Sequence, residues 1–194
     1  MKLFKKVIAT VLAALVLTSC SSMNSAITIG DKEFSTSDVQ KPVDEVLRDR
    51  KIVDTTGMQL AQADELLRNQ AQFFIVGVLL DRIATDKKLS VTNADIAARR
   101  TEILSQVGGE AELPKALVSA SLAQSNLDAY LKILIISEKL SKDIILSGVS
   151  SEQAAEEVNK IVVAVAKKLG VKVNPKYGTW NADTASIESG DITD

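Results

Sequence analysis

The chain has 194 residues, with 23 basic and 25 acidic side chains, one cysteine and no histidine. Without histidine it cannot build a Ser-His-Asp or Cys-His catalytic site or a histidine metal site. A single cysteine excludes an intramolecular disulfide, so a packed core must supply the stability. We therefore expect a protein that is not an enzyme and that needs no cofactor and no metal ion.

Residues 1–19 have the pattern of a lipoprotein signal peptide. Three lysines precede an apolar core at residues 7–17, and the sequence Leu17-Thr18-Ser19-Cys20 follows. This site resembles a bacterial lipobox, in which the cysteine thiol is acylated, for example with palmitate, before the signal is cut. The alternatives are an ordinary signal peptide, or an N-terminal membrane anchor with an incidental cysteine. We expect acylation at Cys20 and a lipid-anchored protein on the extracytoplasmic face of the cell membrane.

Cleavage after residue 19 removes three of the 23 basic residues and none of the 25 acidic ones, so the formal net charge falls from −2 to −5. This excess of negative charge argues against nucleic acid or anionic lipid as a partner. Membrane attachment would then depend on the acyl chain at Cys20 and not on a basic patch. We divide the mature chain into a tether (20–25), one helical domain (26–180) and an acidic disordered tail (181–194).

The first half of the domain is predicted to contain one strand and two helices. Residues 26–29 form a short strand candidate, and Gly30-Asp31 follows as a turn. A helix is expected over about residues 37–50, and because Pro42 fits a helix only in its first turn, a later start is the alternative. A long helix is then expected from Met58 to Lys87, about 45 Å in length.

The second half is predicted to contain four helices and one strand. Their expected starts are marked by capping residues: Thr92 before 93–106, Ser125 before 126–146, and Ser150 with Gln153 before 151–169. A short helix is expected over 110–120, and a strand over 171–173 after Gly170 at the C′ position. The fold class is therefore mostly α, with a long central helix and one or two short strands near the termini.

The long helix contains an unbroken apolar run over residues 73–80, FFIVGVLL. A membrane span needs about 20 such residues, so this run is too short to cross a bilayer. A helix that is apolar on every side must be surrounded by other groups. Two interpretations remain: the run is core against residues 126–146, which we favour for any single residue, or part of it lines a groove for a bound polypeptide. Candidate contact residues for such a client are Phe73, Phe74 and Leu80.

Several phrases, in order, resemble the N-terminal chaperone region of the SurA and PrsA foldases. After the lipobox come ITIGDKEFSTSDV, a helix, and a long helix that ends in DRIATDKKLSVTNADIAARRTEI. The later phrases LPKALVSASLAQSNLDAYLKILIISEKL and VKVNPKYGTWN resemble the next part of that region and its terminal strand. The positions that match the family pattern at the entry to the shorter helix are Leu89, Val91, Thr92, Ala94, Asp95 and Ile96.

This resemblance implies a trigger-factor/SurA-type peptide-binding fold. It also implies a lipid-anchored, non-catalytic chaperone that binds unfolded or extended secreted polypeptides. Foldases insert a parvulin prolyl isomerase domain where residues 146–150 here join two helices directly, and its site uses histidines, so isomerase activity is not expected. The alternative is a structural or adaptor lipoprotein that binds one specific envelope partner.

Overall fold

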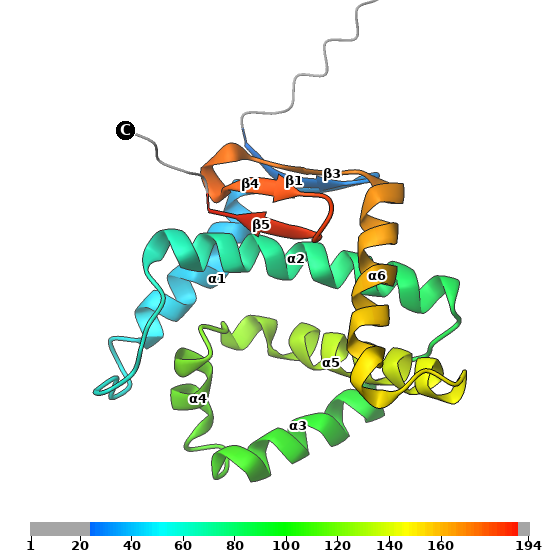
Figure 1. Ribbon diagram of the computed structural model, residues 1–194. Helices are drawn as coiled ribbons and strands as arrows, with labels where there is room; N and C mark the ends of the chain where they lie inside the picture. The colour runs from blue at the N-terminus through cyan, green and yellow to red at the C-terminus, as the bar shows by residue number, and fades with distance from the viewer. Residues whose placement is uncertain (1–23, 190–194) are drawn as a thin grey trace, which may run out of the picture.

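The computed structural model describes residues 24–189, in which five α-helices and five short strands are arranged around a sixth, long helix, α2 (Figure 1). The prediction of a mostly helical fold with a long helix and a few short strands near the ends is confirmed. The helices are α1 (Thr36–Asp49), α2 (Ala63–Asp86), α3 (Asn93–Val107), α4 (Leu113–Ser119), α5 (Leu127–Leu146) and α6 (Ser151–Leu169). The strands are β1 (Ser25–Ile29), β2 (Lys32–Ser35), β3 (Val171–Val173), β4 (Thr179–Asn181) and β5 (Ser186–Glu188).

The strands join the two ends of the described chain. β1 pairs antiparallel with both β2 and β3, so Ile27 lies opposite Phe34 on one side and Val173 on the other. β4 and β5 form a separate antiparallel hairpin. Figure 1 shows both groups of strands on one side of α2, with α3, α4 and α5 on the other side. The sheet therefore closes one face of the central helix.

Both faces of α2 are packed. Toward the strands and α6, Ala71, Ile75 and Leu79 belong to one core cluster. Toward α5, Leu80 and Ile83 belong to a second cluster that also includes Ile136 and Leu140 of α5. The apolar run of α2 is therefore mainly core, because a helix with two packed faces has to be apolar on both.

The long helix begins five residues later than expected, at Ala63 and not at Met58. The Arg50 guanidinium explains this difference, because its Nη1 donates to the carbonyl oxygen of Ala61 at 2.8 Å. A second nitrogen of the same group contacts Ser121 Oγ at 3.3 Å. Residues 58–62 are thus held as a loop against distant groups, which sequence periodicity does not reveal.

Two predicted caps are wrong in detail. Ser125 lies in a 3₁₀ turn (Gln124–Asn126), and its backbone N–H donates to Glu45 Oε1 of α1 at 3.0 Å. Asn126 is the N-cap of α5 and makes no side-chain cap, because its amide donates to Gln70 Oε1 at 3.1 Å. α6 begins at Ser151 as expected, yet Ser150 makes no side-chain bond to the helix backbone. At both helices the observed start is close to the predicted one, but the predicted side-chain cap is not formed.

The prediction of a disordered tail from residue 181 is wrong over the described residues. β5 forms there, and Ala185 and Ile187 are buried against α2. The Gln72 side chain holds this strand with two hydrogen bonds of 2.9 Å: its Nε2 donates to the Ala185 carbonyl, and its Oε1 accepts from the Ile187 N–H. A distant glutamine thus supplies the bonds that a neighbouring strand would supply. Residues 190–194 lie outside the described residues.

The predicted signal peptide (1–19) and Cys20 also lie outside the described residues, as does most of the predicted tether (20–25). Within residues 24–189, no helix has the length and apolar character that a membrane span requires.

Candidate functional site

One face of α5 carries apolar side chains that nothing in residues 24–189 covers. An open groove of about 570 Å³ runs along this face. Ile145 is 40% exposed and Leu146 is 75% exposed, and Tyr130, on the same helix, is 37% exposed. Spacings of three and four residues place the groove on one side of the helix. The residues that line it are Leu134, Ser137, Glu138, Ser141, Lys142, Ile145 and Leu146.

The other faces of α5 are packed against neighbouring helices. Leu127 and Leu131 pack with α3 and α4, and Ile136 and Leu140 pack with α2 and α6. Leu134, Ile145 and Leu146 line the groove and belong to no core cluster of the described residues. α5 therefore has more apolar surface than its own domain buries.

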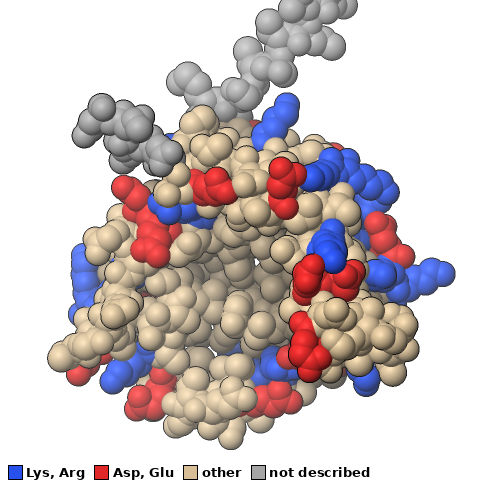
Figure 2. Space-filling model, in the orientation of Figure 1, with Lys and Arg blue, Asp and Glu red and all other residues tan. Residues whose placement is uncertain are grey.

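The molecule is hollowed on the face that Figure 2 shows. The hollow lies below α2, in the region that α3, α4 and α5 frame in Figure 1. Its interior in this view is formed by uncharged residues, and lysines, arginines and acidic residues are visible around its rim. Such an arrangement suits a guest with apolar side chains, because burial of apolar area is non-directional and does not require a particular sequence.

The three predicted client-contact residues do not form one open site. Leu80 is only 2% exposed and lies in the core between α2 and α5, so a bound polypeptide cannot reach it in this conformation. The ring of Phe74 stacks on Phe34 with a centroid distance of 4.9 Å and packs against the core on the strand side. Both residues are therefore better explained as core, which is the first of the two interpretations of the apolar run given above.

Phe73 has a different environment from the other two. It is half-buried, and the one ring contact recorded for it among residues 24–189 is edge-on to Phe74 at 6.0 Å. Its helical position, three residues after Gln70 and four before Gly77, places it on the side of α2 that faces α5. Gln70 bonds to Asn126 there, and a side chain added at Gly77 would meet Ile133 at 3.7 Å. Of the three predicted residues, Phe73 therefore remains a candidate for contact with a bound polypeptide.

The groove on α5 was missed by the sequence prediction. The available signal was the high apolar content of residues 127–146, which is more than one packed face requires. That signal identifies the helix and does not identify which side stays open. The packing of α3 and α6 decides the open side.

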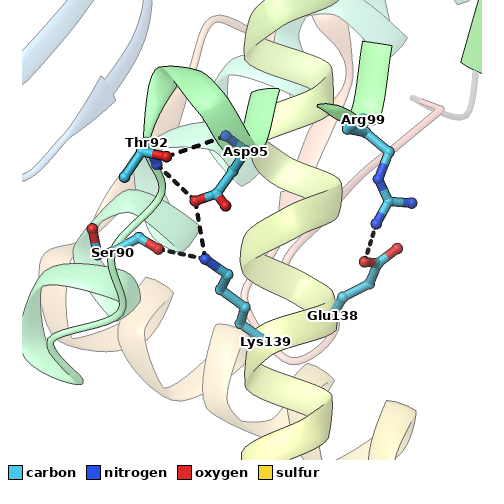
Figure 3. A network of polar contacts seen from close by, with 6 residues as sticks. All are labelled: Ser90, Thr92, Asp95, Arg99, Glu138 and Lys139. Carbon is cyan, nitrogen blue, oxygen red and sulfur yellow. Dashed lines mark hydrogen bonds and ion pairs between the residues drawn. The ribbon is translucent and has the colours of Figure 1, made fainter. Parts of the chain in front are cut away.

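Polar contacts attach α3 to α5 beside the groove (Figure 3). The Lys139 ammonium donates to the Ser90 carbonyl at 2.7 Å and to Asp95 Oδ2 at 3.2 Å. Asp95 in turn completes the capping box of α3 with Thr92. The Thr92 backbone N–H, and next the Lys139 ammonium, hold the pKa of the Asp95 carboxyl below its usual value. This network fixes the start of α3 to the middle of α5.

A second ion pair lies one turn further along α3. The Arg99 guanidinium donates to Glu138, which is a groove residue of α5, and Figure 3 shows the two side chains pointing toward each other. Arg99 also pairs with Glu102 at 3.2 Å. One positive group thus lies between two carboxylates on this flank of the groove.

The site contains no recognised catalytic or metal-binding arrangement within residues 24–189, where no group of three or more His, Cys, Asp and Glu side chains could hold a metal ion. Its chemistry is that of an apolar surface with hydroxyl groups in the middle and charges at one flank.

Comparison with known proteins adds no family, because no family model, curated protein or solved structure matches the chain. The fold defines a mostly helical domain with a long central helix and short strands near its ends. Function has to be argued from the site, since a fold alone does not determine it.

Proposed function

We propose that this protein is a lipid-anchored, non-catalytic chaperone that holds unfolded or extended exported polypeptides outside the cytoplasmic membrane. The observation that carries the proposal is the open apolar groove along α5, where Ile145 and Leu146 are exposed and Leu134 is half-buried. Exposed apolar surface of this kind usually marks an interaction site.

The groove has the properties that a tolerant binding site needs. Its open volume of about 570 Å³ gives room for a few side chains of a guest chain. The hydroxyls of Ser137 and Ser141 lie along the same face, and a hydroxyl can either donate to a backbone carbonyl or accept from a backbone N–H. Apolar contact combined with such adaptable groups favours binding without sequence selection.

The resemblance to the SurA and PrsA chaperone region supports the same proposal. The matching residues from Leu89 to Ile96 lie at the junction of α2 and α3, where Asp95 links the capping box to Lys139 of α5. In this chain α5 and α6 are joined by residues 147–150 alone. Prolyl isomerase activity is therefore not part of the proposal.

Acylation at Cys20 would keep the domain near the membrane surface. β1 starts at Ser25, five residues after Cys20, and an extended segment of that length spans at most about 18 Å. Figure 1 shows β1 on the strand side of α2, so the anchor would attach to the domain through that side. A replacement of Cys20 by Ser is expected to abolish partitioning into detergent, and a variant that still partitions would contradict the acyl anchor.

The chaperone proposal is tested with the soluble chain, residues 21–194, mixed with several unrelated unfolded clients. We expect light-scattering assays to show suppressed aggregation, and we expect Ile145→Ser with Leu146→Ser to lose most of it. Ile52→Ser is the matched control, because Ile52 is a 76% exposed apolar residue in the loop after α1. If the wild-type chain protects no client at stoichiometric excess, the proposal fails.

A photo-crosslinker at Leu134 or Phe73 in whole cells gives a second test. A general chaperone is expected to give a broad set of crosslinked polypeptides at both positions. A single crosslinked species would instead favour an adaptor with one envelope partner.

A further inference from the structure

We propose that the groove face of α5 is also a self-complementary interface, on which α5 of a second copy packs antiparallel across a two-fold axis. The partner is thus another molecule of this chain. This inference concerns self-association and does not depend on chaperone activity.

The apolar residues of the groove are arranged symmetrically along the helix. Leu134 lies near one end and Ile145 near the other, with Ser137 and Ser141 between them. The midpoint between Leu134 and Ile145 and the midpoint between Ser137 and Ser141 both fall close to residues 139 and 140. When two copies of the helix run antiparallel about that point, Leu134 of each copy faces Ile145 of the other, and the serines meet in the middle. A surface that pairs with its own copy in this way is the requirement for a closed dimer.

The small side chains at the centre favour close packing of the two helices. Packed helices approach to about 8–10 Å depending on the side chains between them, and serine is among the smallest. The stretch from Leu134 to Ile145 covers about 16 Å of helix at 1.5 Å per residue. The two larger apolar residues would then close each end of this contact.

Charge complementarity selects the antiparallel arrangement. Glu138 and Lys142 are one helical turn apart on the same flank of the groove. Arg99 lies between the carboxylates of Glu138 and Glu102, so these three groups together carry a net negative charge. Lys142 has no ion pair or side-chain hydrogen bond with the rest of residues 24–189. In the antiparallel dimer Lys142 of each copy faces Glu138 of the other, whereas a parallel dimer would place like charges together.

The test measures the dissociation constant of the dimer by sedimentation equilibrium, using the mature chain with Cys20→Ser so that acylation cannot drive association. Glu138→Lys and Lys142→Glu are each expected to weaken the dimer about tenfold or more, because each creates like-charge contacts twice. The double variant, Glu138→Lys with Lys142→Glu, restores opposite charges and is expected to restore the dimer. Lys168→Glu, an exposed lysine near the end of α6, is the control and should leave association unchanged.

Lys142→Glu is the more direct of the two single variants, because it leaves the Arg99 contacts intact. Circular dichroism is used to check that each variant is folded. A wild-type chain that stays monomeric at about 100 μM overturns the inference, since a useful dimer should form well below that concentration. A dimer that is insensitive to the single charge changes, or one that the double variant does not restore, also overturns it. If the chain is monomeric and the variant with Ile145→Ser and Leu146→Ser still loses client protection, the groove serves clients alone and the chaperone proposal stands.

Discussion

The two sides of α2 differ in how completely the chain covers them. On the strand side, residues from both ends of the domain form one core around Ile75, and Tyr177 is buried there at 2% exposure. On the α5 side, the packing is divided into smaller clusters, and ion pairs such as Arg99 with Glu138 hold the helices together. The strand side has the larger continuous core, whereas the α5 side leaves an apolar groove open. The comparison indicates where stability resides and where a partner can bind.

The largest expected effect separates these two regions directly. Ile75→Ala should lower the free energy of unfolding by about 2–5 kcal/mol, because Ile75 is fully buried and a cavity remains. Leu146→Ala should change it by less than about 0.5 kcal/mol, since Leu146 is exposed. Chemical denaturation of both variants checks this. Equal losses at the two positions would show that the groove is part of the core.

A smaller effect is expected at the turn before β4. Gly178 has φ +122°, and a Cβ there would lie 2.1 Å from the Glu188 carbonyl oxygen. Gly178→Ala should cost about 1–3 kcal/mol and loosen the β4–β5 hairpin, which amide hydrogen exchange would report. Gly109→Ala is the control, because Gly109 has a similar φ of +101° with no atom within 4 Å of the added carbon. If the two variants lose equal stability, the crowding at Gly178 is not what fixes the hairpin.

The smallest effect concerns the polar network beside the groove. Hydrogen bonds from Thr92 and Lys139 lower the pKa of Asp95 in the folded state, so the ionised carboxylate stabilises α3. This contribution is complete above the unfolded value of about 4 and is lost as the pH falls through the lower folded pKa. The stability difference between wild type and Asp95→Asn should therefore shrink as the pH is lowered from 6 to 2. A difference that stays constant over this range would mean that the charge of Asp95 contributes nothing.

Features that depend on neighbouring residues could be predicted well. Thr92 and Asp95 form the expected capping box, because both partners lie within one helical turn. Gly170 ends α6 in a positive-φ conformation as expected, and residues 171–173 form the expected strand. The interpretation of Phe74 and Leu80 as core also agrees with their packing.

Features that depend on distant residues could not be predicted in the same way. Ala61 is held out of α2 by Arg50, and Ser125 donates its N–H to Glu45 and does not cap a helix. The strand at residues 186–188 depends on Gln72, which is more than 100 positions earlier in the chain. In each case a side chain from another element takes the backbone group that a local rule would assign elsewhere.

The sequence by itself determined that the protein is mostly helical, that its long helix is apolar on more than one side, and where most helices begin. These properties follow from periodicity and capping, which act over a few residues. Only the tertiary structure decided that the apolar groove lies on α5, while Phe74 and Leu80 of α2 pack in the core. The reason is physical: both helices carry surplus apolar surface, and the strands cover that of α2, while α3 and α6 leave one side of α5 uncovered.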